Sequence, residues 1–250
     1  MPKLILEKNH EKTEPGQKGR NLLIEGGTLL TIDGDNRKFV GDLYLEQGII
    51  KGIYQAGHTP YLGPVDRLDA VDCYVMPGLV QAHVHLNQTL FRGLAENLEL
   101  LDWLNQKIFP LEFAHTYESV FAFACLGIAE LLLSGTTSCL DMGTVRHTEA
   151  LFESAKRFGF RLTSGKALMD RGEASASLLL ESTKQGISDS VCLAEKWHNS
   201  EEGLLRYAFS PRFILTCSDD LMRRSALMAR ELGCLLHTHA AENMAEIKEV

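Results

Sequence analysis

The chain has 250 residues, 45% of them hydrophobic, and its 25 Lys and Arg residues against 33 Asp and Glu residues give a formal net charge of −8. This acidic balance argues against nucleic acid or an anionic membrane surface as the main partner, because both require a basic face. No apolar run approaches the ~20 residues of a membrane-spanning helix, so no membrane partner is expected.

The first 73 residues predict an arm and a small β subdomain. Residues 1–20 are polar and lack the apolar core of a signal peptide, so we expect a flexible arm there. Residues 21–73 carry short strand-like runs interrupted by glycines and by Asp-Gly or Asp-Asn pairs. That pattern indicates a partial β-sandwich.

The six cysteines form no CxxC pair, and most of them lie in apolar segments. Reduced, buried cysteines have this distribution, so the sequence predicts a cytoplasmic protein. A zinc cluster built from cysteines is not expected.

Residues 74–250 alternate between strand and helix patterns. Four times a helical stretch is followed by a glycine and then by an apolar strand, with Gly135, Gly159, Gly203 and Gly233 placed to end the helices. With residues 74–85 this makes five strands of an α/β fold, about five of the eight in a (β/α)8 TIM-type barrel. A complete open sheet is the alternative, but a Gly-rich phosphate turn after the first strand is missing. We therefore predict an incomplete barrel.

Catalytic groups of such barrels lie at the carboxyl ends of the strands. Here the first strand ends in His83 and His85, and the fifth ends in His237 and His239, with Glu242 close behind. Residues two apart in a strand point the same way, so each pair faces the barrel mouth. Converging neutral imidazoles bind a metal such as Zn²⁺, and a nearby carboxylate can move protons. The sequence thus predicts a divalent metal site.

For other polar residues near strand ends, the sequence supports a role in the site less strongly. For Asp141 a loop or cap hydrogen bond and a role in the site are about equally favoured, whereas Lys166 and Asp170 are interpreted as structural. Packing is favoured over substrate contact for Trp103. Four further histidines are interpreted as surface or helix-cap residues: His58, His115, His147 and His198.

The segments MPGLVQAHVHLNQTLFRGL, GIAELLLSGTTSCLDMG, SPRFILTCSDDLM and LHTHAAENMAEI together resemble the amidohydrolase superfamily. The most similar branch comprises aminohydrolases of purines and related N-heterocycles: guanine deaminases, methylthioadenosine/S-adenosylhomocysteine deaminases and triazine hydrolases. The resemblance runs from about residue 21 to residue 250.

The resemblance implies one divalent metal, zinc or sometimes iron, held by His83, His85 and His239. It makes Glu242 the proton shuttle and His237 a neighbour in the strand. A second metal would need a carboxylated lysine at the end of the fourth strand, where this chain has Arg212.

The resemblance also implies how substrate would be held. Gln88 and Arg212 match positions that hold the purine ring in guanine deaminases, which favours an oxo-purine or pterin-like base over an adenosine-type substrate. Phe91, Arg92 and Trp103 are expected in the substrate wall. The implied reaction is hydrolysis of a C–N bond, with ammonia leaving. The alternative is a triazine-type chlorohydrolase or alkylaminohydrolase.

The family pattern extends beyond this sequence. A further His at the end of strand 6 and an Asp at the end of strand 8 have no counterpart before Val250. We therefore expect the front part of a deaminase, a homo-oligomer when full length. The alternatives are a non-catalytic paralogue or half of a two-chain barrel.

Overall fold

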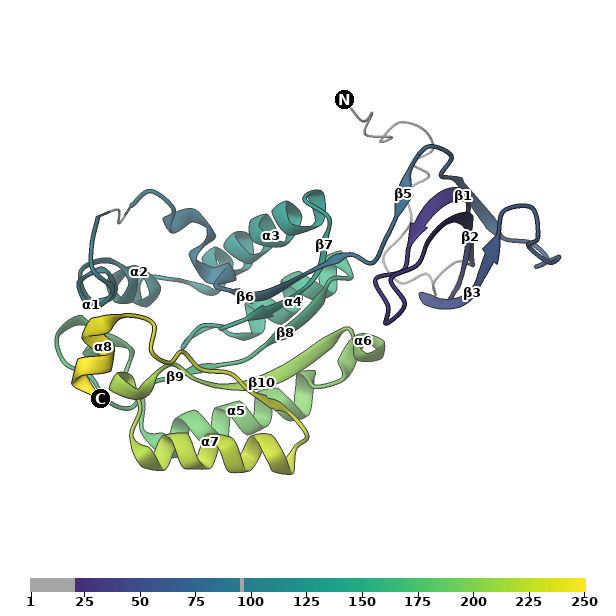
Figure 1. Cartoon of the computed structure of the whole chain (residues 1–250). Helices are drawn as coiled ribbons and strands as arrows, with labels where there is room; N and C mark the ends of the chain where they lie inside the picture. Colours follow the sequence, from purple (N-terminus) through teal and green to yellow (C-terminus); the bar gives the residue numbers. More distant parts are fainter. Residues whose placement is uncertain (1–20, 95–96) are drawn as a thin grey trace. The chain divides into compact units, whose positions relative to one another are not determined.

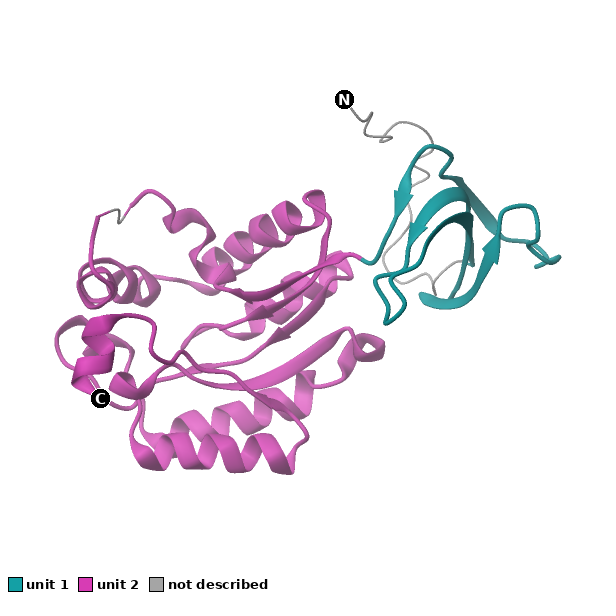
Figure 2. Ribbon diagram, viewed as in Figure 1, with its two compact units in different colours: residues 1–77 teal, residues 78–250 magenta. Residues whose placement is uncertain are grey.

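The computed structural model describes residues 21–94 and 97–250, so the arm predicted at residues 1–20 lies outside the described residues. Within the chain, contacts separate two compact units, and the division falls between Pro77 and Gly78 (Figure 2).

The first unit is built on one mixed sheet. Its strands are β1 (Leu22–Leu30), β2 (Lys38–Glu46), β3 (Ile49–Gln55), β4 (Asp66–Asp69) and β5 (Tyr74–Val75). The order is β3-β2-β1-β4, and β5 also pairs with β1. β2 runs antiparallel to β1 and β3, whereas β4 and β5 run parallel to β1. This sheet is the small β subdomain expected from the sequence.

The second unit contains a parallel sheet that forms a half-barrel (Figure 1). Its strands are β6 (Leu79–Val84), β7 (Thr136–Asp141), β8 (Arg161–Ser164), β9 (Ala167–Leu168), β10 (Leu205–Pro211) and β11 (Leu235–Leu236). The order is β11-β10-β8-β7-β6, and the short β9, which follows β8, pairs with β10. Sequential strands are neighbours, and all pairs are parallel. The prediction of an incomplete α/β barrel of about five strands is confirmed.

Helices connect these strands and run alongside them (Figure 1). The α-helices are α1 (Leu100–Trp103), α2 (Phe109–Phe113), α3 (Tyr117–Leu133), α4 (Glu149–Phe158), α5 (Thr183–Trp197), α6 (Ser200–Gly203), α7 (Asp219–Glu231) and α8 (Met244–Glu249). Short tighter or wider helical turns are η1 (Leu86–Phe91), η2 (Leu104–Ile108), η3 (Ala174–Leu179) and η4 (Ile214–Thr216).

The helix ends follow the chemistry of the sequence. Thr116 caps α3 by accepting from the Ser119 N–H at 3.3 Å, and Ser218 caps α7 by accepting from the Leu221 N–H at 3.1 Å. Gly159 ends α4 in the left-handed region, with φ 60°. An L side chain is strained in this conformation, so glycine is the suitable residue.

The core of the second unit lies between the sheet and its helices. Tyr207 and Phe209 in β10 are fully buried, as are Val120, Ala124 and Ile128 on one face of α3. This apolar face of α3 packs into the core, and its burial stabilises the βα units.

The six cysteines are unpaired thiols, as expected. Among the described residues no single helix is long and apolar enough to cross a membrane. Leu100–Phe113 and Tyr117–Leu133 meet that criterion only as a pair, and the pair bends by 115°. The cytoplasmic location stays a prediction.

Candidate metal centre

Four histidines converge from the two edges of the parallel sheet. His83 lies in β6 and His85 directly follows it, whereas His237 and His239 follow β11, at the opposite end of the strand order. Nε2 of His239 lies 3.2 Å from Nε2 of His85 and 3.3 Å from Nε2 of His83. The curvature of the half-barrel thus joins residues 154 and 156 positions apart.

The geometry of these nitrogens fits a metal ion. Ligand atoms of His83, His85 and His239 all lie within 4.8 Å of one another. Nitrogens bound at about 2.0–2.1 Å around a tetrahedral ion are separated by roughly 3.3–3.4 Å, which matches the two Nε2 distances. The donor set of three imidazoles suits zinc and related transition metals.

A backbone carbonyl orients His239. Its Nδ1 donates to the carbonyl oxygen of Arg212 at 2.8 Å, so Nε2 carries the free lone pair that a metal needs. Nδ1 of His83 lies 3.2 Å from Nε2 of His237. His237 therefore contacts a predicted ligand, and its assignment as a neighbour in the strand rather than a ligand stays a prediction.

The surroundings of His85 and His237 favour the neutral form of these two side chains. Burial and the nearby Arg212 guanidinium lower the pKa of His85 well below its usual value. Burial and the neighbouring His83 and His239 lower the pKa of His237 to about 4. Neutral imidazole is the form that binds metal, so this environment favours binding at neutral pH.

Glu242 lies on the loop between β11 and α8, and it is exposed. Burial and the neighbouring His239 lower the pKa of His83, and the charge of Glu242 opposes this change. The Glu242 carboxylate is therefore within electrostatic reach of His83, as a proton shuttle would need to be. Its role in catalysis stays a prediction.

The two residues expected to hold a substrate ring both contact Glu112 in α2. Arg212 donates from Nη1 to Oε2 at 2.6 Å and from Nη2 to Oε1 at 3.2 Å. Gln88 donates from Nε2 to Oε1 at 2.7 Å. The Arg212 guanidinium also lies over the Phe109 ring, 5.0 Å from its centroid. Ring recognition by Gln88 and Arg212 stays a prediction.

The sequence analysis did not identify Glu112. Burial alone would raise the pKa of its carboxyl, but the Arg212 charge and the donated hydrogen bonds lower that pKa below its usual value. A signal was present, because Glu112 interrupts the apolar stretch KIFPLEFAH. A charge in an apolar helix requires a buried partner.

Phe91 packs against helix α3 rather than standing free. Its ring stacks on His115 at 5.2 Å and meets Phe123 edge-on at 5.5 Å. His115 itself is buried, and its Nε2 lies 2.8 Å from the carbonyl oxygen of Asn87. The interpretation of His115 as a surface or cap residue is therefore wrong, because the ring bridges η1 and α3.

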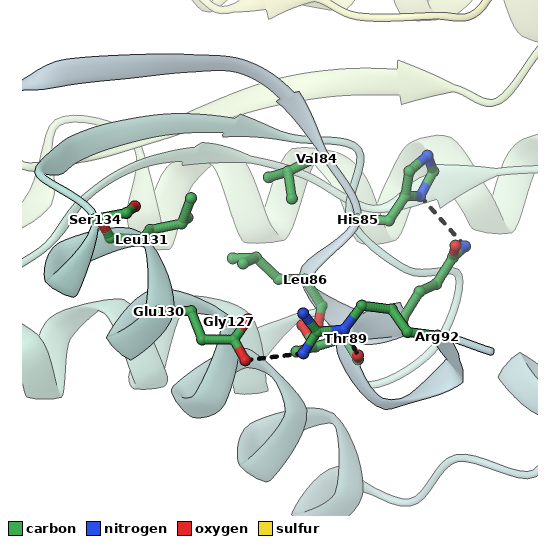
Figure 3. A pocket seen from close by; sticks show the side chains of 10 residues that line it. Val84, His85, Leu86, Thr89, Arg92, Gly127, Glu130, Leu131 and Ser134 are labelled. Atoms are coloured by element: carbon green, nitrogen blue, oxygen red, sulfur yellow. Dashed lines mark hydrogen bonds and ion pairs between the residues drawn. The ribbon is translucent and has the colours of Figure 1, made fainter.

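Arg92 and Trp103 lie in different surroundings. Arg92 lines a cavity of about 530 Å³ between η1 and α3, next to His85, and pairs with Glu130 at 2.8 Å (Figure 3). Trp103 is partly buried and packs against the apolar cluster that includes Leu104 and Phe109. A place for either residue in the substrate wall stays a prediction.

Asp141, at the end of β7, is a fully buried hydrogen-bond acceptor. It accepts from the Leu86 N–H at 2.8 Å, the Gly143 N–H at 3.0 Å and the Ser164 hydroxyl at 2.6 Å. The bond from Leu86 holds the start of η1, directly after His85. Burial raises the pKa of Asp141 to about 6 although the hydrogen bonds oppose the change.

Lys166 and Asp170 have structural partners, as interpreted from the sequence. Lys166 pairs with Glu181 at 2.9 Å and donates to the Val145 carbonyl. Asp170 accepts from the Thr183 and Ser218 hydroxyls at 2.6 Å and 2.5 Å.

Comparison with known proteins agrees with this geometry. A family model described as "Amidohydrolase family" matches residues 74–250. The 5-methylthioadenosine/S-adenosylhomocysteine deaminase of Syntrophobacter fumaroxidans is 34% identical over 245 residues, which cover 94% of this chain and 52% of that protein.

Solved structures give the same result. Guanine deaminase of E. coli superimposes with a TM-score of 0.80 at 30% identity, covering 90% of this chain and 54% of that one. Atrazine chlorohydrolase of Arthrobacter aurescens, solved with zinc, has a TM-score of 0.77 at 21% identity, covering 87% and 52%. At that identity the likeness concerns the fold. The chain spans about half the length of the curated relatives it matches.

Proposed function

The chain belongs to the amidohydrolase family. From this premise we propose that it forms part of a metal-dependent hydrolytic deaminase. The substrate would be a purine, a purine nucleoside or a related amino-substituted N-heterocycle. One observation carries the proposal: Nε2 of His239 lies 3.2 Å from Nε2 of His85 and 3.3 Å from Nε2 of His83, so imidazoles from the two edges of the half-barrel meet.

The relatives support the choice of substrate class. Two that are at least 30% identical to this chain bear the names of deaminases, one of methylthioadenosine and S-adenosylhomocysteine, the other of guanine. Since the chain spans about half of each, the activity of the whole protein is part of the proposal.

In this proposal His83, His85 and His239 hold one divalent metal, zinc in first place and iron as the alternative. A metal held there lowers the pKa of water that binds it. Glu242 accepts a proton from the attacking water and delivers it to a ring nitrogen. Water adds at the carbon that bears the amino group. The hydroxyl proton of this adduct then passes to the amino nitrogen, the C–N bond breaks as the carbonyl forms, and ammonia leaves.

We also propose a cytoplasmic homo-oligomer. The six free thiols support the location, because disulfides are rare in the cytosol. Exposed apolar side chains on the edge strands, among them Val80 and Leu235, support association. Light scattering would measure the oligomeric state, and a monomer at all concentrations would contradict the proposed homo-oligomer.

An assay of the zinc-loaded chain tests the proposed reaction. We expect ammonia release from one of guanine, an adenosine-type nucleoside or a pterin, and at least about a hundredfold loss in Glu242→Gln, as for removal of a general acid–base group. Chloride or alkylamine release from triazines, without ammonia release from purines, would favour the alternative reaction. Full activity of Glu242→Gln, or no turnover by the zinc-loaded chain, would contradict the proposal.

A further inference from the structure

Asp141 joins the carboxyl ends of three neighbouring strands. The residue ends β7 and is fully buried. Its Oδ1 accepts a hydrogen bond from the Leu86 N–H, at the start of η1 after β6. Its Oδ2 accepts from the Gly143 N–H after β7 and from the Ser164 hydroxyl at the end of β8. One carboxylate therefore connects the ends of β6, β7 and β8.

The backbone on both sides of His85 is bonded to the end of β7. Before His85, the Val84 carbonyl oxygen accepts from the Met142 N–H at 2.9 Å. After His85, the Leu86 N–H donates to Asp141 at 2.8 Å. Because both neighbours of His85 are held, the direction of its Cα–Cβ bond is restricted, and with it the place that the imidazole can reach.

An acceptor is needed here because the chain leaves the sheet after His85. The ladder between β6 and β7 ends at the pair of Val84 and Asp141, and η1 begins at Leu86. N–H groups in the first turn of a helix have no acceptor within that helix. His85 precedes η1 and makes no side-chain capping bond to it. Asp141 supplies the acceptor from the next strand, which leaves the His85 imidazole free to face His239.

The second oxygen of the Asp141 carboxylate is held by closely packed loops. Gly143 has φ 81°, and a Cβ on it would overlap the carbonyl oxygen of Gly165. The loops after β7 and β8 therefore pack backbone against backbone, which only glycine allows at position 143. With the Ser164 hydroxyl at 2.6 Å and the Gly143 N–H at 3.0 Å, this packing gives the carboxylate a fixed orientation.

We propose that Asp141 is a positioning residue, which through the Leu86 N–H fixes the backbone that carries His85 to the metal. This inference rests on the proposed function, because it takes His85 as a metal ligand. Removal of a group that orients a metal ligand typically lowers metal affinity about 10–100-fold. An Asp141 that only connected strands would stabilise the fold and leave metal affinity unchanged.

Zinc affinity of two Asp141 variants separates these roles. Asp141→Ala removes the acceptor, and we expect its zinc dissociation constant, measured in competition with a chelator, to rise about 10–100-fold. Asp141→Asn removes the charge but keeps a carbonyl oxygen that can accept from Leu86, so its affinity should stay within about threefold of wild type. Unchanged affinity in Asp141→Ala would overturn the positioning role. Equal weakening in both variants would also overturn it, because the negative charge would then act on the metal directly.

Asp170 offers a matched control for loss of stability. Its carboxylate accepts from the Thr183 and Ser218 hydroxyls, and neither partner adjoins a histidine of the cluster. Asp170→Ala should lower the free energy of unfolding, as Asp141→Ala does, and keep the zinc affinity of wild type. Equal loss of zinc affinity in the two alanine variants would trace the effect to general destabilisation and overturn the proposal.

Cobalt gives a signature that a change in stability alone would not alter. Tetrahedral Co²⁺ absorbs visible light more strongly than Co²⁺ with more ligands. We expect weaker absorption from the cobalt-loaded Asp141→Ala chain, because a displaced His85 makes room for water, and the wild-type spectrum from Asp141→Asn. A wild-type spectrum from Asp141→Ala at full cobalt occupancy would contradict the positioning role.

A measurement without metal keeps the two proposals distinguishable. The Leu86 N–H should exchange slowly with solvent in the metal-free wild type and much faster in Asp141→Ala. Fast exchange in wild type would overturn the role of Asp141. Failure of wild type to bind zinc or cobalt would instead contradict the proposed function, and the exchange of Leu86 would still decide whether Asp141 holds the backbone at His85.

Discussion

The middle and the edges of the parallel sheet differ in what covers them. In β10, an inner strand next to the edge strand β11, Tyr207 and Phe209 are fully buried between the sheet and its helices. In the edge strands β6 and β11, Val80 is 71% exposed and Leu235 is 57% exposed. Arg212, which pairs with Glu112 of α2, directly follows the inner strand β10, whereas the histidines lie in the edge strands or directly after them.

The inner strands and the edge strands of the sheet are held in place by different interactions. Burial of apolar side chains and of a satisfied ion pair holds the middle in place by itself. The edges meet at His83, His85 and His239, and three neutral imidazoles with facing nitrogens attract one another little. We therefore expect a bound metal to order the edges and to leave the middle nearly unaffected. The following predictions test this contrast from the largest expected effect to the smallest.

Loss of Arg212 should have the largest effect, because it acts in the middle. Arg212→Met leaves the Glu112 carboxylate buried without a charged partner, which typically costs about 3–5 kcal/mol of unfolding free energy. Urea denaturation followed by circular dichroism measures this loss of unfolding free energy. As a control, Arg92→Met breaks an exposed pair with Glu130 and should change stability very little. Equal changes in unfolding free energy for the two substitutions would contradict the larger contribution expected of the buried pair.

Asp141 should make stability depend on pH. Its pKa is raised from 3.8 to about 6 in the folded chain, so the folded state keeps a proton that the unfolded state has already lost. Stability should then fall as pH rises from about 4 to 6, by roughly 3 kcal/mol for a shift of about two units.

Denaturation of the metal-free chain across pH 4–7 tests this expectation, with Asp141→Asn as the reference. The fall with pH attributed to Asp141 should be absent from the variant. Identical pH profiles for the two proteins would contradict the raised pKa of Asp141.

Zinc should act on the edges. Free zinc at a hundred times its dissociation constant stabilises a single-site protein by about 2.7 kcal/mol. Hydrogen exchange should slow most in β6 and in the segment after β11, and least in β8 and β10. Protection spread evenly over the sheet, or absent from β6, would argue against a metal that joins the two edges.

The smallest effect should follow substitution of exposed apolar residues on the edges. Val80→Lys and Leu235→Lys should change unfolding free energy by less than about 0.5 kcal/mol and reduce self-association. Leu133→Lys on α3, where the side chain is 79% exposed, is the matched control. Light scattering decides the outcome: equal reduction by all three substitutions would mean that association does not use the sheet edges.

Local patterns predicted the order of strands and helices because each βα unit is read from contiguous residues. The four helix–glycine–strand units and the five parallel strands agree with the structure. The expected convergence of two histidine pairs followed from one rule, that strand ends of a barrel share one face. The choice of His239 over His237 as the ligand came from the family resemblance and stays a prediction.

Long-range polar contacts could not be derived in the same way. Glu112 and Arg212 are 100 residues apart, and no local period links them. His115 looked like a helix-start residue, but its environment comes from Phe91 and Asn87, on a different element. Sequence can identify a charge that needs a buried partner, whereas the identity of the partner comes from the fold.

Metal content of the purified chain and two single variants tests the central claim most directly. Elemental analysis after zinc loading and desalting should find about one zinc per chain in wild type and in His237→Ala, and almost none in His239→Ala. That result would place the metal on His83, His85 and His239, between the two edges of the sheet. Absence of zinc from wild type, or equal loss in both variants, would contradict the proposed centre.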